Sequence, residues 1–467
     1  MEGIRRATHR KDGNGLSASP EVFFDESLPL FVRAIAEHLG ADALKQGLIV
    51  RDSSGRLRFL SSEVPPSEEL RADIEKRIAN VLGAYARMDG AISFRDDPGV
   101  QRLLNDPETF PMREGSLNFS LLDRRIIGSA WLNAPQEETA KPPRIVFASL
   151  KGGVGRSTAL AVTAADLARR SKNILVVDLD LEAPGVGDML LDGERVPRLG
   201  TIDYLVENGL GGISDRHLSD FIGTSPLTSP GGGRVDVLPA LGKEALRNPS
   251  NTLPKLSRAM IEDIDPEGVS VPVAVQIADM IRRFTGRDSY DVVLIDSRAG
   301  LSELAAPAIL GLGANVLLFG TAQRHTIRGY AALFAGLKLL ADRDIKARRP
   351  AEWRLSFKAV YAKAGLDEPT GERYRDELYE LFADNLYDAD DNQQDNPDAI
   401  SFDIDDENAP HWPLVIPFTQ NFVDFDPVQA PSQLNAPFYE QAYRPFLSGI
   451  DSIIAPSGVA IDESENK

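Results

Sequence analysis

The chain has 467 residues, of which 42% are hydrophobic and 26% charged, and its formal net charge is −19. It contains no cysteine, which excludes disulfides and thiolate metal sites, and its five scattered histidines argue against a histidine-rich metal centre. No run approaches the roughly 18 apolar residues that span a bilayer, so we expect a cytoplasmic protein without membrane contact. The negative charge disfavours nonspecific binding of DNA or anionic lipid by the surface as a whole.

The first part of the chain predicts a small α+β domain over residues 21–133, after a disordered N-terminus at residues 1–20. A helix is expected over Leu28 to Leu39, and LIVRDSSGRLRFL predicts a hairpin that turns at Ser53 to Gly55. A second helix is expected over residues 67–88, with its apolar face at Leu70, Ile74, Ile78, Val81 and Leu82. The segment SLNFSLLDRRIIGSAWL is typical of one or two strands. Because this region contains no catalytic constellation, we expect an adaptor or regulatory domain.

A linker is predicted at residues 134–143, APQEETAKPP, and the domain boundary is placed there. From residue 144 to 450, short strands rich in Val, Ile and Leu alternate with helical stretches, as in a parallel sheet that is covered on both faces. The expected strands are Ile145 to Ala148, Ile174 to Val177, Val235 to Leu238, Val292 to Ile295, Val316 to Phe319, Phe357 to Tyr361 and Leu414 to Ile416.

This alternation predicts a doubly wound, mostly parallel α/β domain. Such sheets bind ligands at the carboxyl ends of their strands. Residues 200–232 and 240–290 are expected to be largely helical insertions, and residues 451–467 a flexible acidic tail.

A glycine loop lies in the stretch RIVFASLKGGVGRST, Arg144 to Thr158, between a buried strand and a helix that is expected to begin near Ser157. Glycines let the backbone curl so that its N–H groups point into one concavity, and the helix dipole favours an anion there. The spacing matches the phosphate-loop signature, except that Arg156 stands where a lysine normally precedes the hydroxyl residue. The predicted phosphate-binding residues are Gly152, Gly153, Val154, Gly155, Arg156, Ser157 and Thr158.

Two other strands end in carboxylates. The strand that ends at Val177 is followed by Asp178 and Asp180, and the strand that ends at Ile295 is followed by Asp296. A phosphate site with bound Mg²⁺ needs a hydroxyl and carboxylates near the metal, and a group that holds the attacking water. Ser157 and these aspartates could supply them, although an aspartate at the end of a buried strand also serves as a helix cap or loop residue.

With these pieces in order, residues 143–420 resemble the deviant Walker A phosphate-loop ATPases of the ParA, MinD and CobQ type. The loop KGGVGRST looks most like the subgroup called KGGVGR-motif variant AAA ATPases. The other matching pieces are NILVVDLDLEAPG (173–185), RVDVLPAL (234–241), YDVVLIDSRAGLSE (290–303) and ANVLLFGTAQ (314–323). The resemblance implies a SIMIBI-like P-loop NTPase fold, ATP and Mg²⁺ as cofactors, slow hydrolysis, and a homodimer that encloses ATP.

The resemblance also implies roles for single residues. Lys151 would be the signature lysine that reaches the phosphates of the partner subunit, although it could also be a solvated loop lysine. Ser157 would bind Mg²⁺, and Asp178 would support the metal site. Asp180 would orient the attacking water. Asp296 and Gly300 would form the second metal-side and switch element.

Three departures from the family pattern qualify these roles. Arg156 replaces the compact charge of the loop lysine with a planar fork, which makes nucleotide binding a safer inference than fast hydrolysis. Arg298 stands in a switch that usually contains proline; it could stabilise charge like an arginine finger supplied in cis, or form a salt bridge to a nearby carboxylate. Lys363 follows a strand where relatives often have an asparagine that reads adenine, so the base preference is open and ATP is the first choice.

Two charged segments have simpler explanations. Residues 384–408 hold ten acidic side chains and no basic one, but they lack the glycine and the ligand spacing of a calcium loop, which favours a solvated loop. The basic cluster Arg343, Lys346, Arg348 and Arg349 could contact nucleic acid, but a solvated helix face is favoured.

The sequence therefore predicts a Mg-ATP-binding dimerisation switch whose N-terminal domain passes the nucleotide state to a protein partner. One alternative is a nucleotide sensor with negligible hydrolysis, because of Arg156. Others are a DNA-partition-type ATPase that binds nonspecific DNA, and a metabolic enzyme of the amidotransferase or synthetase branch. A membrane-positioning role is disfavoured, since the C-terminus is acidic and lacks a basic amphipathic helix.

Overall fold

The computed structural model describes residues 22–64, 67–87, 89–136, 141–226, 232–265, 268–388 and 399–455. The chain divides into two compact units, Met1–Ile126 and Ile127–Lys467. This division falls before the segment 134–143 in which the sequence placed the boundary. The N-terminus predicted to be disordered, residues 1–20, lies outside the described residues. In the described residues, no helix has the length and apolar character needed to cross a membrane.

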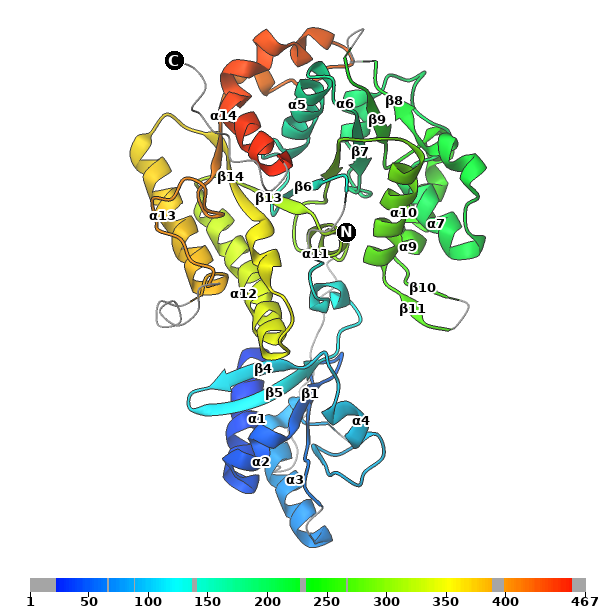
Figure 1. Cartoon of the computed structure of the whole chain (residues 1–467). Coiled ribbons are helices and arrows are strands. Elements are labelled where there is room, and N and C mark those ends of the chain that lie inside the picture. The colour runs from blue at the N-terminus through cyan, green and yellow to red at the C-terminus, as the bar shows by residue number, and fades with distance from the viewer. Residues whose placement is uncertain are drawn as a thin grey trace, which may run out of the picture. The chain divides into compact units, whose positions relative to one another are not determined.

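The N-terminal unit is built on a five-stranded sheet with the order β3-β2-β1-β5-β4 (Figure 1). Strands β1 and β5 pair in parallel; β1 is also antiparallel to β2, β5 is antiparallel to β4, and β3 is parallel to β2. The strands are β1 (Leu48–Arg51), β2 (Leu57–Leu60), β3 (Ile92–Ser93), β4 (Phe110–Glu114) and β5 (Leu117–Asp123). The helices are α1 (Phe24–Leu39), α2 (Ala41–Gln46), α3 (Glu68–Leu82) and α4 (Val100–Leu104). The predicted α+β domain is therefore present.

Helices α1 and α3 share one apolar core with the sheet. Helix α3 begins after the cap Ser67, whose Oγ accepts from the backbone N–H of Leu70, and it buries Ile74, Ile78 and Leu82. It ends earlier than the predicted residue 88, because Gly83 follows with a φ of 54°. Leu70, predicted on the buried face, is instead 49% exposed. The predicted hairpin is confirmed as β1 and β2, and the predicted first helix as part of α1.

The second unit contains an eight-stranded sheet with the order β15-β14-β13-β6-β12-β7-β9-β8. Neighbouring strands are parallel, except that β8 is antiparallel to β9. The strands are β6 (Arg144–Ser149), β7 (Ile174–Asp178), β8 (Gly223–Thr224), β9 (Val235–Leu238), β12 (Val292–Asp296), β13 (Asn315–Gly320), β14 (Phe357–Ala364) and β15 (Leu414–Pro417). All seven predicted strands are present, and the doubly wound, mostly parallel α/β fold is confirmed.

Helices cover both faces of this sheet (Figure 1). Helices α5 (Arg156–Arg169), α6 (Val186–Leu190) and α14 (Ala436–Ile454) share one apolar core with it. Helices α10 (Val273–Arg287), α11 (Ala305–Leu310), α12 (Arg324–Lys346) and α13 (Glu368–Asn385) lie on the other side. Because α14 continues to Ile454, the first residues of the predicted flexible tail are helical.

The predicted insertions are mainly helical, as expected. They hold α7 (Thr201–Gly211), α8 (Lys243–Arg247) and α9 (Thr252–Ala259), together with a small hairpin of β10 (Asp263–Ile264) and β11 (Ser270–Val271). Short 3-10 turns, such as Asp215–Phe221, join these elements.

Three adjacent strands, β6, β12 and β7, place the predicted site residues together. In the sheet register, Asp296 at the end of β12 pairs with Phe147 of β6 on one side and with Asp178 of β7 on the other. The glycine loop after β6 and the residues after β7 and β12 consequently emerge at the same edge of the sheet.

Candidate functional site

The glycine loop joins β6 to α5 through two left-handed residues. Gly153 has a φ of 76° and Gly155, the cap of α5, has a φ of 95°. A Cβ at either position would meet no atom within 4 Å, so the backbone conformation requires glycine here, while crowding does not. The loop thus leads directly into the N-terminus of a 14-residue helix, where backbone N–H groups favour a bound anion.

A cavity of about 390 Å³ lies over this loop. All seven predicted phosphate-binding residues line it, together with Ser149, Asp180, Ala183, Met189, Arg298 and Ala299. Its lining does not include Lys151, Asp178 or Asp296. The cavity therefore brings together the loop and the residues that follow β7 and β12, as the sequence predicted.

A second cavity, of about 340 Å³, shares Gly153, Val154, Gly155 and Thr158 with the first. Its remaining walls come from the ends of β14 and β15, the segment after β15, and α14; they are Lys363, Ile416, Pro417, Phe418, Thr419, Phe422, Val423 and Tyr443. Apart from Lys363, these residues were not predicted from the sequence. The pattern that could have found them is the strand ending at Ile416, whose carboxyl end lies at the same edge of the sheet as the glycine loop.

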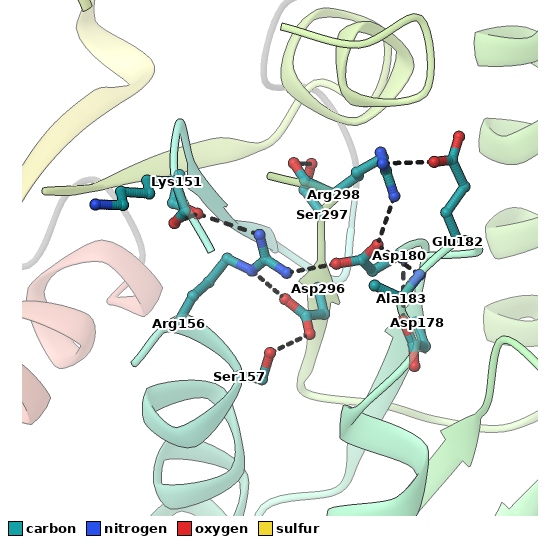
Figure 2. Close-up of polar contacts among 11 residues, drawn as sticks. Lys151, Arg156, Ser157, Asp178, Asp180, Glu182, Ala183, Asp296, Ser297 and Arg298 are labelled. Carbon is teal, nitrogen blue, oxygen red and sulfur yellow. Dashed lines mark hydrogen bonds and ion pairs between the residues drawn. The ribbon is translucent and has the colours of Figure 1, made fainter. Parts of the chain in front are cut away.

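The Arg156 guanidinium is buried between two carboxylates (Figure 2). Its Nε donates to Asp296 Oδ1 at 2.6 Å, its Nη2 to Asp180 Oδ2 at 2.9 Å, and its Nη1 to Ser149 Oγ at 3.2 Å. Burial lowers the pKa of Arg156, but the carboxylates of Asp296 and Asp180 outweigh it, so the pKa is raised overall. Arg156 is therefore a fully charged bridge inside the site, only 8% exposed.

Ser157 and Asp296 form a pair of hard oxygen ligands at the start of α5. The hydroxyl of Ser157 donates to Asp296 Oδ2 at 2.6 Å. Burial raises the pKa of Asp296, although Arg156 and Ser157 act in the opposite direction. The described residues contain no group of three His, Cys, Asp or Glu side chains that could hold a metal alone. The pair fits Mg²⁺, which is commonly bound through one or two carboxylates together with substrate phosphates.

Asp178 lies behind the site. Its side chain is fully buried, its Oδ1 accepts from the backbone N–H of Asp180 at 3.0 Å, and its Oδ2 has no hydrogen-bond partner within the described part of the chain. Burial, followed by the nearby Asp296, raises the pKa of Asp178 well above its ordinary value. Asp178 thus supports the backbone of Asp180, which lines the cavity, while Asp178 itself does not line it.

Asp180 is held through both of its oxygens. Oδ2 accepts from Arg156, and Oδ1 accepts from the backbone N–H of Ala183 at 3.3 Å and pairs with Arg298 Nη1 at 3.5 Å. Arg298 also pairs with Glu182 Oε2 at 2.5 Å. Of the two roles predicted for Arg298, the salt bridge is therefore present in the structure.

Lys151 differs from the two arginines in having an exposed side chain. Figure 2 shows its ammonium pointing away from the carboxylates. Its backbone carbonyl accepts from Ser149 Oγ at 3.1 Å, which fixes the start of the glycine loop. The charge of Lys151 is thus directed to the outside of the site.

The basic cluster lies at the C-terminal end of α12 and in the residues that follow it, and it is not solvated as a whole. Arg343 is only 2% exposed and donates from Nη1 to the carbonyl of Leu132 at 2.9 Å. Arg349 pairs with the buried Asp344 at 2.7 Å. Both interactions are intramolecular, so the prediction of a fully solvated face was wrong. The nucleic-acid alternative is weakened as well, because two of the four basic side chains are already engaged within the chain.

Only part of the acidic segment can be described, since residues 389–398 lie outside the described residues. Asp388, just before this gap, pairs with Arg354 at 2.8 Å and accepts from the backbone N–H of Ile400 at 2.7 Å. Its carboxylate therefore has a structural role at the base of the segment.

The fold and the glycine-loop site define a P-loop nucleotide-binding domain. Residues 145–340 match the family model described as the CobQ/CobB/MinD/ParA nucleotide binding domain, which supports a nucleotide-binding domain of the ParA and MinD type. The narrower assignment to the KGGVGR-motif subgroup stays a prediction. No curated protein matches the chain.

Several solved structures are similar to the chain at low identity. The Pyrococcus furiosus cell division ATPase MinD is 19% identical over 67% of this chain and 99% of its own, with a TM-score of 0.40. The pNOB8 ParA bound to nonspecific DNA is 14% identical over 67% and 97%, with a TM-score of 0.39. The cobyrinic acid a,c-diamide synthase from Mycobacterium smegmatis with bound ADP and magnesium is 20% identical over 52% and 83%, with a TM-score of 0.33.

Proposed function

We propose that the second unit binds Mg²⁺ and a nucleoside triphosphate, for which the resemblance implies ATP, and that it works as a dimerisation switch. The backbone N–H groups of the glycine loop would bind the phosphates in the first cavity. Ser157 and Asp296 would hold the metal, which supplies positive charge beside the phosphates. The observation that carries this proposal is the Ser157–Asp296 pair at 2.6 Å beside the cavity over the loop.

The second cavity has the character of a base-binding site. It adjoins the loop and is walled mainly by apolar and aromatic side chains, including Phe422 and Tyr443. Pockets of this size that are mostly apolar and carry a few polar groups are typical of small-molecule sites. A nucleotide with its phosphates on the loop would therefore have its base between β15 and α14.

Dimerisation is proposed because of Lys151. Its ammonium makes no hydrogen bond or ion pair with the described residues and points away from the carboxylates of its own subunit (Figure 2). In a face-to-face homodimer this charge would be available to phosphates bound by the partner subunit. The proposed location of the dimer is the cytoplasm.

Glu303 provides a route by which the site could act on the N-terminal unit and a protein partner. Glu303 lies in the loop that follows Asp296, and its carboxylate accepts from the backbone N–H groups of Gly128 and Ala130 and from Ser129 Oγ. Gly128 and Ala130 come directly after the N-terminal unit in the sequence. A shift of the loop that follows Asp296 would therefore move Glu303, the acceptor for these N–H groups, and would disturb the segment that leads to that unit.

A second candidate function, a nucleotide sensor with negligible hydrolysis, is favoured by one specific observation. Both oxygens of Asp180 already pair with guanidinium groups, one from Arg156 and one from Arg298. A carboxylate that accepts from two cations has little capacity left to orient an attacking water. Nucleotide binding would then be retained while hydrolysis is suppressed.

Two measurements on the purified full-length protein test these proposals. Titration of a fluorescent ATP analogue with Mg²⁺ tests binding, and absence of binding contradicts both candidate functions. Phosphate release by the wild type, Lys151→Ala and Asp180→Ala tests hydrolysis. A single background rate for all three proteins, with binding retained, supports the sensor and overturns the ATPase.

Arg156→Lys sharpens this comparison. The lysine keeps a positive charge but loses the fork that bridges Asp180 and Asp296, so a restrained Asp180 would be released. If Arg156 suppresses hydrolysis, this variant releases phosphate about tenfold faster than the wild type or more, since positioned bases contribute roughly 10²–10⁴-fold. An unchanged rate would assign the low activity to another cause.

A further inference from the structure

The basic side chains of the two cavities differ in whether a carboxylate already neutralises them. Three of them line the cavities: Arg156 and Arg298 the first, and Lys363 the second. All three nitrogens of Arg156 donate within the chain, and Arg298 pairs with two carboxylates. Lys363 has no carboxylate partner among the described residues; its ammonium is bound by a backbone carbonyl instead. Lys363 therefore holds the charge in these cavities that a bound anion can still neutralise.

Lys363 is turned toward the glycine loop by an irregularity in strand β14. The pairing of β14 with β15 shifts register between Ala362 and Ala364, and Lys363 itself has a φ of 52°. Bulges turn a side chain away from the regular alternation of a strand, and such backbone conformations are common at functional sites. The bulge accounts for Lys363 being exposed while Ala362 and Ala364 are buried.

The ammonium of Lys363 lies at the part of the glycine loop that both cavities share. Its Nζ donates to the carbonyl of Gly153 at 2.6 Å. Gly153, Val154, Gly155 and Thr158 line both cavities. An ammonium has three N–H donors and no acceptor, so two donors of Lys363 remain for a ligand at this junction.

A nucleotide that occupies both cavities must cross this junction. In the proposed function its terminal phosphates lie in the first cavity and its base in the second, so the phosphate nearest the ribose lies over the shared residues. The backbone N–H groups of the loop donate to phosphates but carry no net charge. Arg156, the cation within the loop, is bound to carboxylates, so the loop by itself leaves that phosphate without a cationic side chain.

We propose that Lys363 supplies, from strand β14, the phosphate-binding charge that Arg156 does not supply, and that it contacts the phosphate nearest the ribose. This inference rests on the proposed function, because it requires a nucleotide with its phosphates on the glycine loop. Nucleoside diphosphates and triphosphates share this phosphate, so Lys363 contributes to the binding of both. Lys363 is thereby a binding residue of the phosphate site rather than a solvated strand-end lysine.

Equilibrium binding of ADP and of a slowly hydrolysed ATP analogue to the full-length protein with Mg²⁺, at low and high salt, tests the proposal. Lys363→Met keeps the apolar stem and removes the charge. We expect it to bind both nucleotides at least about tenfold more weakly at low salt, as for the loss of a hydrogen bond to a charged group. Salt screens charges that are open to solvent, so this deficit should shrink to about threefold or less at about 1 M salt.

Two further variants complete the comparison. Lys363→Arg keeps a positive charge and should retain most of the wild-type affinity. Lys172→Met is the matched control, because it changes the net charge by the same amount. Lys172 is 49% exposed and precedes β7, at the end of that strand away from the glycine loop, so this variant should bind both nucleotides like the wild type.

Three results would overturn the inference while leaving the proposed function intact. One is wild-type affinity in Lys363→Met. Another is a deficit that does not change with salt or is equally large in Lys363→Arg, which would assign Lys363 to the conformation of the loop. The third is a deficit for the ATP analogue alone, which would place the charge at the terminal phosphate. If the wild type binds neither nucleotide, the proposed function itself fails.

Discussion

Arg156 Nε donates to Asp296 Oδ1 at 2.6 Å, so the residue at the phosphate-loop lysine position is bound to the carboxylate at the end of β12. The same guanidinium reaches Asp180, which lies after β7. One side chain thereby connects the loops that follow three adjacent strands. Arginine can do this because its five N–H donors lie in a rigid fork, whereas a lysine is a single point of charge.

Removal of Arg156 should be strongly destabilising. Arg156→Ala leaves the buried carboxylates of Asp180 and Asp296 without their cation, and breaking a buried pair in this way typically costs about 3–5 kcal/mol. We expect a loss of this size in the free energy of unfolding, measured by urea denaturation of the second unit's transition. Arg373→Ala is the control, since Arg373 is 60% exposed and its pair with Glu377 at 3.9 Å should contribute less than about 1 kcal/mol. Similar losses for both variants would contradict a structural role for the Arg156 bridge.

The strands and the location of the site could be predicted from the sequence because both depend on local patterns. Buried parallel strands are short apolar runs, and residues that follow such strands meet at one edge of the sheet. The direction of the Arg156 side chain could not be predicted, since its partners lie 24 and 140 residues away in the sequence. The exposure of Leu70 was mispredicted because helical spacing alone does not show where the buried stripe ends.

Glu303 should control the order of the segment that leads to the N-terminal unit. Glu303→Ala removes the acceptor for the backbone N–H groups of Gly128 and Ala130, so these amides should exchange with deuterium faster. In the wild type, nucleotide should change the exchange of residues 127–132, and in the variant this response should be lost. Glu207→Ala, on α7, is the control. Nucleotide-dependent exchange that survives in Glu303→Ala would exclude this route.

His411 should make the second unit less stable in mild acid. It is 1% exposed, its Nδ1 lies 2.8 Å from the Tyr387 hydroxyl, and its Nε2 lies 3.1 Å from the carbonyl of Ile404. A neutral ring that accepts at Nδ1 and donates at Nε2 satisfies both partners. Burial lowers the pKa of His411 below 6.5; nearby Lys358 also lowers it, whereas the Ile404 carbonyl and Asp406 act in the opposite direction.

Because the pKa is lower in the folded state than in the unfolded state, this stabilisation is complete above pH 6.5 and is lost as the pH falls through the folded pKa. We expect the urea midpoint of the wild type to decrease between about pH 7.5 and about pH 5.5 by more than that of His411→Gln. His325→Gln, at an exposed histidine, is the control and should follow the wild type. Parallel curves for wild type and His411→Gln would refute the role of His411.

Two further features show where sequence patterns fail for a physical reason. Arg343 belongs to a basic run at a helix end, which is usually solvated, yet it is buried against the Leu132 carbonyl from the segment that precedes β6. Lys363 could be located at the end of a strand, but its contact with Gly153 depends on a bulge that changes the direction of its side chain. In both cases the partner is a backbone carbonyl. Every residue type has this group, so the sequence does not indicate which carbonyl the side chain contacts.

Lys151 should be needed for nucleotide-dependent dimerisation. Its exposed ammonium points away from the carboxylates of its own subunit, so Lys151→Ala should leave folding and nucleotide binding by the monomer nearly unchanged (Figure 2). Light scattering of the wild type with Mg²⁺ and slowly hydrolysed ATP and GTP analogues should show the mass doubling with the nucleotide that binds. Lys151→Ala should keep the monomer mass, because each phosphate group would lack the charge from the partner subunit.

Lys76→Ala, at an exposed lysine of α3, should dimerise like the wild type. A wild-type mass that stays unchanged with bound nucleotide would exclude the dimer, and a dimer of Lys151→Ala would assign the interface to other residues.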